Sequence, residues 1–203
     1  MFDGAIRPKL DPFLKRVAKA LVTAGFSANA VTVLGLVIGL VAAGAIWLQL
    51  YWLALALILI SRVCDGLDGA VARLTKKTDY GGYLDIVLDF AFYGAIPLGF
   101  VLADPAANAV AGAVLIFSFY VNGASFLAFA IMAEKHNLTT DQRGEKSFFF
   151  STGLAEATET IVVFVLFCLF PTWFPIIAYL FAAIVFYTAL SRIIMTRKAL
   201  AST

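Results

Sequence analysis

Four aspartates within 25 residues are the side chains best suited to chemistry: Asp65, Asp68, Asp85 and Asp89. The first two are three residues apart and the last two are four apart, so each pair occupies one face of a helix. Four unpaired carboxylates would repel one another and take up protons. Divalent cations remove that cost, and hard oxygen ligands suit Mg²⁺ or Mn²⁺. Two such ions about 3.5–4 Å apart are the usual arrangement for phosphoryl chemistry.

Small residues and arginines accompany these carboxylates. Gly66 and Gly69 flank Asp68, and the missing side chains would let a bulky anion approach the helix backbone. Arg73 lies four residues after Gly69 on the same face, where a guanidinium is a natural phosphate ligand. Arg62 lies three residues before the first aspartate, and it either balances charge there or extends its head group to the membrane interface. Helix packing through small residues explains the glycines but not the four aspartates.

The composition places this cluster in a membrane. Of the 203 residues, 62% are hydrophobic and only 14% are charged, and the mean hydropathy is +0.93. A soluble domain is about 45–50% apolar and about 25% charged, so in water this chain would expose large apolar patches. A soluble enzyme, a secreted disulfide scaffold and a nucleic-acid binder are therefore disfavoured, and the net charge of +2 implies no nucleic acid. Cys64 and Cys168 lie in apolar runs, where we expect buried reduced thiols.

Six expected transmembrane helices and one surface helix must position the aspartates. Runs of about 20 apolar residues fall at 29–49, 51–73, 82–103, 107–133, 147–170 and 173–196. Apolar residues at helical spacing over 10–24, with basic residues on the other side, predict an amphipathic helix on the membrane surface. We expect one all-α domain over 1–203, made of a juxtamembrane helix at 1–25 and a six-span bundle over 26–203.

Basic residues set the expected orientation. With six spans, all 15 Lys and Arg residues fall toward one side, and the short loops of the other side hold a single charge, Asp104. The positive-inside rule then predicts that both termini lie in the cytoplasm. A short loop joins the second and third spans, which makes them antiparallel neighbours. We therefore expect the four carboxylates to converge in one pocket at the cytoplasmic interface.

Residues 65–89 match D-x-x-D-G-x-x-A-R-x(7–8)-G-x-x-x-D-x-x-x-D at every fixed position. This pattern resembles the signature of the CDP-alcohol phosphatidyltransferase family, and the chain is most similar to bacterial inner-membrane members. The resemblance implies an enzyme in which an alcohol attacks the β-phosphate of CDP-diacylglycerol and CMP leaves. It also implies two Mg²⁺ or Mn²⁺ ions per site, a small alcohol acceptor, surrounding membrane lipids and a homodimer.

The family's roles carry over position by position. The resemblance implies that Asp65, Asp68 and Asp85 are metal ligands, and that Asp89 is both a ligand and the general base. It implies that the CDP moiety is held by Gly69, Ala72, Arg73, Thr78, Asn29 and Thr32. The last two resemble the family's P-N-x-x-T start of the first span, with Ala28 in place of the proline. A plain helix N-cap remains an open alternative for Asn29.

Two groups of residues favour different alcohol acceptors. A phosphorylated polyol such as glycerol 3-phosphate is favoured if its phosphate is held by Lys135, Arg143, Lys146 and Arg192. Loop charge of the positive-inside kind is the alternative role for these residues. An amino alcohol such as serine, ethanolamine or choline is favoured if Glu156 and Glu159, inside the fifth span, bind its amine. A cation transporter is a remote alternative, because intramembrane carboxylates also serve transport.

Overall fold

The computed structural model describes residues 3–135 and 157–200, and nearly all of them are helical. The elements in chain order are α1 (Asp3–Thr23), α2 (Ala28–Trp47), α3 (Tyr51–Leu74), α4 (Asp79–Ala103), α5 (Pro105–Lys135), α8 (Ala157–Leu169), the 3₁₀ turn η1 (Pro171–Trp173) and α9 (Phe174–Leu200). The all-α class is confirmed, since no strand occurs in these two ranges. Five predicted spans coincide with helices to within four residues at either end. The first half of the span predicted at 147–170 lies outside the described residues.

The chain is embedded in a membrane. Four stretches are long and apolar enough to cross a bilayer, namely α2, α4, α5 and the segment Pro171–Arg197 that contains α9. The 24-residue helix α3 differs because every window of 18 residues along it includes Arg62, Asp65 and Asp68. The described part of α8 has only 13 residues. Four spans are thus supported by length and apolarity, and the count of six stays a prediction.

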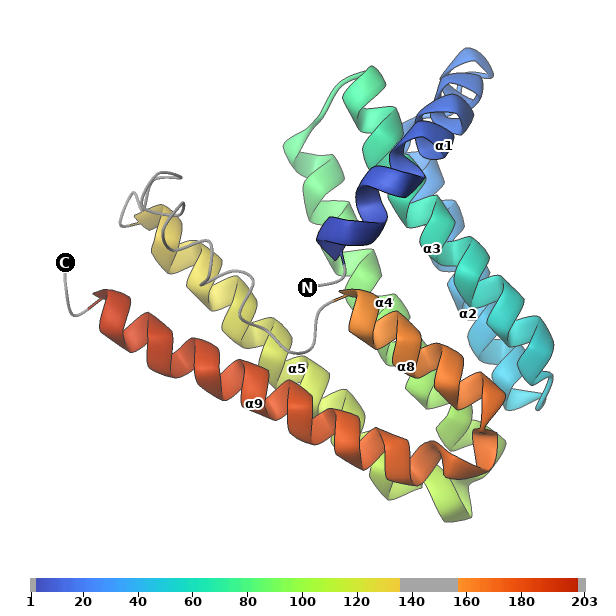
Figure 1. Cartoon of the computed structure of the whole chain (residues 1–203), viewed down its shortest axis with the longest axis vertical. Coiled ribbons are helices and arrows are strands. Elements are labelled where there is room, and N and C mark those ends of the chain that lie inside the picture. Colours follow the sequence, from blue (N-terminus) through green and yellow to red (C-terminus); the bar gives the residue numbers. More distant parts are fainter. Residues whose placement is uncertain (1–2, 136–156, 201–203) are drawn as a thin grey trace.

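Two groups of helices make up the fold (Figure 1). Helix α2 packs closely against both α3 and α4, while α5 and α9 run side by side. Buried aromatic rings join α4 to α8 and α9: the Phe100 ring stacks on Phe174 at 4.8 Å between centroids, and Phe167 lies 4.7 Å from Phe174. Phe100 lies near the end of α4, whereas Asp85 lies near its beginning. The aromatic core extends along α4 as far as Phe92, which packs on Phe164 of α8 and lies one turn from Asp89.

Helices α3 and α4 are not packed against each other as the short loop suggested. Only four residues, 75–78, connect them, yet each makes many more close contacts with α2 than with its partner. The expectation that they are direct neighbours is therefore wrong for their backbones. Side chains from both helices meet in the space between them, and the charged residues described below lie there. Both cysteines are free and buried, as predicted.

Helix α1 lies across α3 (Figure 1) and begins seven residues before the predicted position. Leu14 and Ala18 are buried in a cluster that includes Leu67 and Ala70 of α3. A Cβ atom at Gly66 would lie 3.3 Å from a methyl carbon of Leu14. The interpretation that Gly66 clears space for an anion is thus corrected, because this glycine accommodates α1. Location of α1 on the membrane surface remains a prediction.

Polar residues begin the helices that frame the site. The side chain of Ser27 caps α2 by accepting a hydrogen bond from the backbone N–H of Ala30, at 3.2 Å. The side chain of Thr78 caps α4 in the same way, accepting from the N–H of Gly81 at 3.0 Å. The N-cap alternative for Asn29 is therefore wrong, because Ser27 fills that position.

Candidate active site

Three of the four aspartates converge from two helices. Asp65 and Asp68 of α3 and Asp85 of α4 each offer a carboxylate oxygen, and these oxygens lie within 4.8 Å of one another. Asp68 is only 6% exposed, and within the described chain its buried Oδ2 atom has no hydrogen-bond partner. A buried carboxylate oxygen without a partner is costly unless a cation fills the place. The donor set and this oxygen therefore fit a divalent cation.

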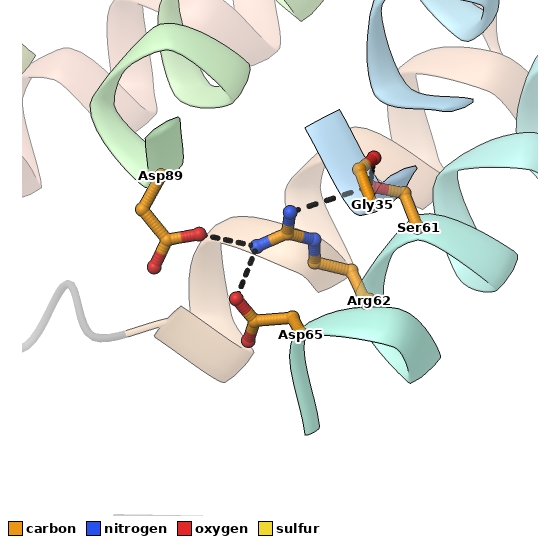
Figure 2. A network of polar contacts seen from close by, with 5 residues as sticks. All are labelled: Gly35, Ser61, Arg62, Asp65 and Asp89. Atoms are coloured by element: carbon orange, nitrogen blue, oxygen red, sulfur yellow. Dashed lines mark hydrogen bonds and ion pairs between the residues drawn. The ribbon is translucent and has the colours of Figure 1, made fainter. Parts of the chain in front are cut away.

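Asp89 occupies the same pocket with a different partner. Its Oδ1 atom accepts a hydrogen bond of 2.8 Å from Nη1 of Arg62. The same nitrogen lies 3.5 Å from Oδ1 of Asp65, so one guanidinium nitrogen lies between two carboxylates (Figure 2). The predicted convergence of the four carboxylates in one pocket is thus confirmed, since Asp89 lines the pocket with Asp65 and Asp68, and Asp85 lies beside these two. The fourth, Asp89, forms an ion pair instead of joining the group of three.

Arg62 is held on several sides. Its side chain is 10% exposed, and its Nη2 atom donates to Oγ of Ser61 at 3.3 Å. That hydroxyl donates in turn to the carbonyl oxygen of Gly35 on α2, at 2.7 Å (Figure 2). The guanidinium carbon lies 3.8 Å from the ring centroid of Phe92, a cation–π distance. Arg62 therefore balances charge inside the bundle, and the alternative of an interfacial head group is wrong.

Sequence reasoning missed Ser61, Gly35 and Phe92 and gave Arg62 no settled role. One signal was available: a cation three residues before Asp65 in an apolar helix needs a buried counter-ion. The particular counter-ion, Asp89, comes from another helix, and helical spacing alone does not reveal such a partner.

The space between these side chains is small. A pocket with room for about one water molecule is lined by Thr32, Gly35, Leu36, Arg62, Asp65, Asp68, Leu88 and Asp89. Its size suits an ion or a water molecule, so a nucleotide would bind beyond it, over the helix ends. The predicted nucleotide contact Thr32 lies in this pocket and donates its hydroxyl to the carbonyl of Ala28, at 3.0 Å.

Two predicted nucleotide contacts meet at the start of α4. A Cβ atom at Gly81 would lie 3.0 Å from Oγ1 of Thr78 and 3.1 Å from Oδ1 of Asn29. Asn29 at the start of α2 and Thr78 in the α3–α4 connection therefore form one polar surface beside Gly81. The glycine in the motif allows these two side chains to come together.

The remaining predicted nucleotide contacts lie along the last turns of α3. The Nη1 atom of Arg73 lies 3.5 Å from the position that a Cβ would take at Gly69, so the exposed guanidinium covers that glycine. Ala72 is half-buried in the same turn. The predicted sharing of one face by Gly69 and Arg73 is confirmed.

Two of the predicted acceptor residues, Arg192 and Lys135, lie on α9 and α5. Arg192 of α9 donates through Nη1 to Oγ of Ser125 at 2.7 Å and to Oδ1 and the carbonyl oxygen of Asn122 at 2.9 and 3.1 Å. Both partners belong to α5, and sequence reasoning identified neither. Lys135 is exposed at the end of α5, and Glu159 is half-buried in the first turn of α8. Three predicted residues lie outside the described ranges: Arg143, Lys146 and Glu156.

Known proteins are similar to this chain over most of its length. It is 45% identical to the Inner membrane protein YnjF of Escherichia coli (strain K12) over 193 residues, which cover 95% of this chain and 94% of that protein. It is 35% identical to an archaetidylinositol phosphate synthase of Pyrococcus horikoshii over 118 residues, covering 58% of this chain and 63% of that protein.

Solved structures share the fold. The crystal structure of Mycobacterium tuberculosis phosphatidylinositol phosphate synthase (PgsA1) with CDP-DAG bound superposes with a TM-score of 0.73 at 18% identity, covering 90% of this chain and 92% of that one. The same synthase in complex with manganese and citrate gives a TM-score of 0.67 at 19% identity, covering 90% and 88%. At such identities the likeness establishes the fold alone.

The aspartate motif, the fold and the relatives point the same way. The sequence profile described as CDP-alcohol phosphatidyltransferase matches residues 26–195, which include every described residue of the two helices that carry the four aspartates. A match of that extent, together with a full-length relative at 45% identity, establishes the family. The chain therefore belongs to the CDP-alcohol phosphatidyltransferases and is an enzyme of that class.

Proposed function

We propose that this enzyme moves a phosphatidyl group from CDP-diacylglycerol to the hydroxyl of a small alcohol, with release of CMP. The observation that carries the proposal is the convergence of Asp65, Asp68 and Asp85 around a buried, unpartnered oxygen of Asp68. The similar fold of a synthase crystallised with CDP-DAG, and of the same synthase with manganese, supports the donor and the metal. Membership in an enzyme family removes the cation-transporter alternative.

Asp65, Asp68 and Asp85 would hold one Mg²⁺ or Mn²⁺ ion, and Asp89 would contribute to a second. When bound, these ions neutralise the diphosphate and stabilise the charge on the departing CMP. Carboxylate ligands suit either ion, so the donor set does not discriminate between them. The six residues expected to bind the CDP moiety would hold its head over the helix ends, because the inner pocket is too small for it.

Asp89 is proposed as the general base. As the acceptor oxygen bonds to the β-phosphorus and the bond from that phosphorus to the CMP oxygen breaks, the hydroxyl proton passes to the Asp89 carboxylate. The ion pair with Arg62 uses Oδ1 of Asp89. Its Oδ2 atom is then the oxygen that takes the proton. The proposed step is thus a direct displacement at phosphorus, without a covalent enzyme intermediate.

A phosphorylated polyol such as glycerol 3-phosphate is the proposed acceptor. Every acceptor that the structure describes for Arg192 is a neutral oxygen, so these bonds do not neutralise its charge. Two relatives are named as synthases of inositol phosphate lipids, which supports an acceptor that carries phosphate. An amino alcohol bound by Glu156 and Glu159 is the competing possibility.

The proposed setting is the inner membrane, with one domain over 1–203 that crosses it six times. All 15 Lys and Arg residues fall toward one side of the six expected spans, which supports a cytoplasmic location for both termini and for the aspartates. The relative named as an inner membrane protein supports the compartment. The proposal includes a surface position for α1 and assembly as a homodimer.

A CMP-release assay tests the function. Purified protein in lipid nanodiscs would receive CDP-diacylglycerol, Mg²⁺ or Mn²⁺, and one acceptor at a time: glycerol 3-phosphate, inositol phosphate, inositol, serine, ethanolamine or choline. Release with a phosphorylated acceptor is the expected result. Release with an amine would transfer the acceptor role to the glutamates. No release with any acceptor, from folded protein that binds the CDP-lipid, would contradict the proposed acceptor range.

A further inference from the structure

Arg62 takes a position that a bridging cation would otherwise take. A single nitrogen, Nη1, lies 2.8 Å from Oδ1 of Asp89 and 3.5 Å from Oδ1 of Asp65. A divalent ion that bound both of these oxygen atoms would displace that nitrogen, because both cations would need the same side of each carboxylate. The other two aspartates differ in this respect: Asp68 and Asp85 join the group of three, and neither forms an ion pair with Arg62.

The bundle fixes the guanidinium independently of the carboxylates. The ring of Phe92, which is fully buried, lies under it at 3.8 Å. That ring is in turn close to α2, since a Cβ atom at Gly39 would lie 2.5 Å from its Cδ2 atom. On the other side, the buried Ser61 hydroxyl accepts from Nη2 and donates to α2. Arg62 is therefore a preorganised cation that contacts residues of α3 and α4, and α2 supports it indirectly through Ser61 and Phe92.

We propose that Arg62 is a positioning residue that holds Asp89 and competes with divalent cations for it, so that the two expected metal sites differ in affinity. The group of Asp65, Asp68 and Asp85 takes up the first ion. Binding at Asp89 is weak because it breaks or weakens a charge-assisted hydrogen bond. This inference rests on the proposed function, since it assumes that the aspartates bind metal.

Mn²⁺ binding to the full-length protein tests the inference without turnover. The free Mn²⁺ signal in electron paramagnetic resonance would be followed during titration of the purified, EDTA-treated protein. We expect one strong and one weak site in the wild type. Arg62→Met should tighten the weak site about tenfold or more, the effect of losing one charge-assisted hydrogen bond. Arg62→Lys should restore weak binding in part, because it keeps the charge but not the planar fork.

One control variant tests the effect of losing a positive charge, and a second variant replaces Arg62→Met if that protein does not fold. Lys76→Gln removes an exposed cation from the α3–α4 connection and should change either affinity less than twofold. If Arg62→Met does not fold, Ser61→Ala removes the acceptor of Nη2 and should tighten the weak site two- to threefold. A variant that was only damaged would bind Mn²⁺ less well, so tighter binding separates positioning from a purely structural role. Unchanged or weaker binding in Arg62→Met, or in Ser61→Ala if it stands in, overturns the inference.

Asp68→Asn distinguishes a failure of the proposed metal site from a failure of the role assigned to Arg62. If the proposed metal site is correct, this variant should lose the strong site. Retention of the strong site in Asp68→Asn would contradict the proposed function at the metal. Loss of the strong site in Asp68→Asn, combined with an unchanged weak site in Arg62→Met, would overturn the positioning role of Arg62 and leave the proposed function intact.

Discussion

Two arginines, one in each group of helices, are held in similar ways but differ in charge balance. Arg62 and Arg192 each donate to a serine hydroxyl and lie near a phenylalanine ring, Phe92 at 3.8 Å and Phe126 at 5.6 Å. Arg62 also pairs with two carboxylates, whereas the described acceptors of Arg192 are neutral oxygens. Among α2, α3 and α4, Arg62 thus pairs with carboxylates of the protein itself, Asp65 and Asp89. Under the proposed function, Arg192 between α5 and α9 would attract the phosphate of the acceptor.

The two arginines differ in how their partners offset the free-energy cost of a charge in a membrane helix. An arginine in a membrane helix needs partners for its donors, and neutral oxygens meet that need without cancelling its charge. Carboxylates meet the need and cancel the charge as well. If α3 and α4 form the chemical half and α5 and α9 the acceptor half, changes to the first should reduce turnover and changes to the second should raise the acceptor KM.

Removal of divalent ions should have the largest effect and should fall on the aspartate half. Excess EDTA is expected to reduce CMP release to the background rate, and Mg²⁺ or Mn²⁺ should restore it. The reason is that Asp65, Asp68 and Asp85 would otherwise hold an uncompensated diphosphate next to their own charges. Initial rates across a titration of free metal provide the measurement. CMP release that continued at the original rate in EDTA would contradict the proposed dependence on divalent ions.

Asp89→Asn should have the next largest effect, a loss of about 10³-fold in turnover, because a general base typically contributes 10²–10⁴-fold. Binding of CDP-diacylglycerol in the presence of Mg²⁺ should be largely retained, since the group of three aspartates is untouched. The measurements are single-turnover CMP release and equilibrium binding of the CDP-lipid.

Asp104→Asn is the matched control for this substitution. Asp104 lies at the opposite end of α4 and accepts a hydrogen bond from the N–H of Ala107, which asparagine can also accept. The control should keep the wild-type rate. A wild-type rate in Asp89→Asn itself would remove Asp89 from the role of base.

Arg192→Gln should act on the acceptor half. We expect the KM for a phosphorylated acceptor to rise about 10–100-fold, the range for losing a hydrogen bond to a charged group, with a smaller change in kcat. Steady-state kinetics at saturating CDP-diacylglycerol would measure both constants. Arg197→Gln, an exposed cation on the same helix, is the matched control. If Arg192→Gln left the KM unchanged while Glu159→Gln raised it for an amine, the amino-alcohol alternative would be preferred.

Local spacing predicted a large part of this molecule. The three-residue spacing was enough to place Asp65 and Asp68 on one face of α3, because a helix fixes which residues share a face, whereas their meeting with Asp85 depends on how α3 and α4 are packed. Hydropathy located five of the helices to within four residues at either end, and this includes α3, whose second half carries Arg62, Asp65 and Asp68. The family resemblance, carried by residues 65–89, is likewise confirmed.

Partners on different helices could not be predicted in this way. The pairing of Arg62 with Asp89 depends on how α3 and α4 pack around α2, and that packing depends on contacts such as the one between Gly39 and Phe92. The role of Gly66 was misassigned for the same reason, since Leu14 comes from a helix far away in the sequence. Periodicity describes one helix at a time, whereas these contacts depend on shape complementarity between helices.

Gly39→Ala tests this last link and should have the smallest effect of the four. The new Cβ would lie 2.5 Å from a Phe92 ring carbon, so the ring that supports Arg62 must move. Overpacking of this kind costs about 1–3 kcal/mol of stability, and turnover should fall only severalfold because every charged group remains. Gly44→Ala on the same helix is the control, since no atom beyond the neighbouring backbone of α2 lies within 4 Å of its Cβ position. Detergent-solubilised unfolding midpoints and CMP release would be measured for both variants. Equal behaviour of the two alanines would mean that Phe92 does not transmit α2 packing to Arg62.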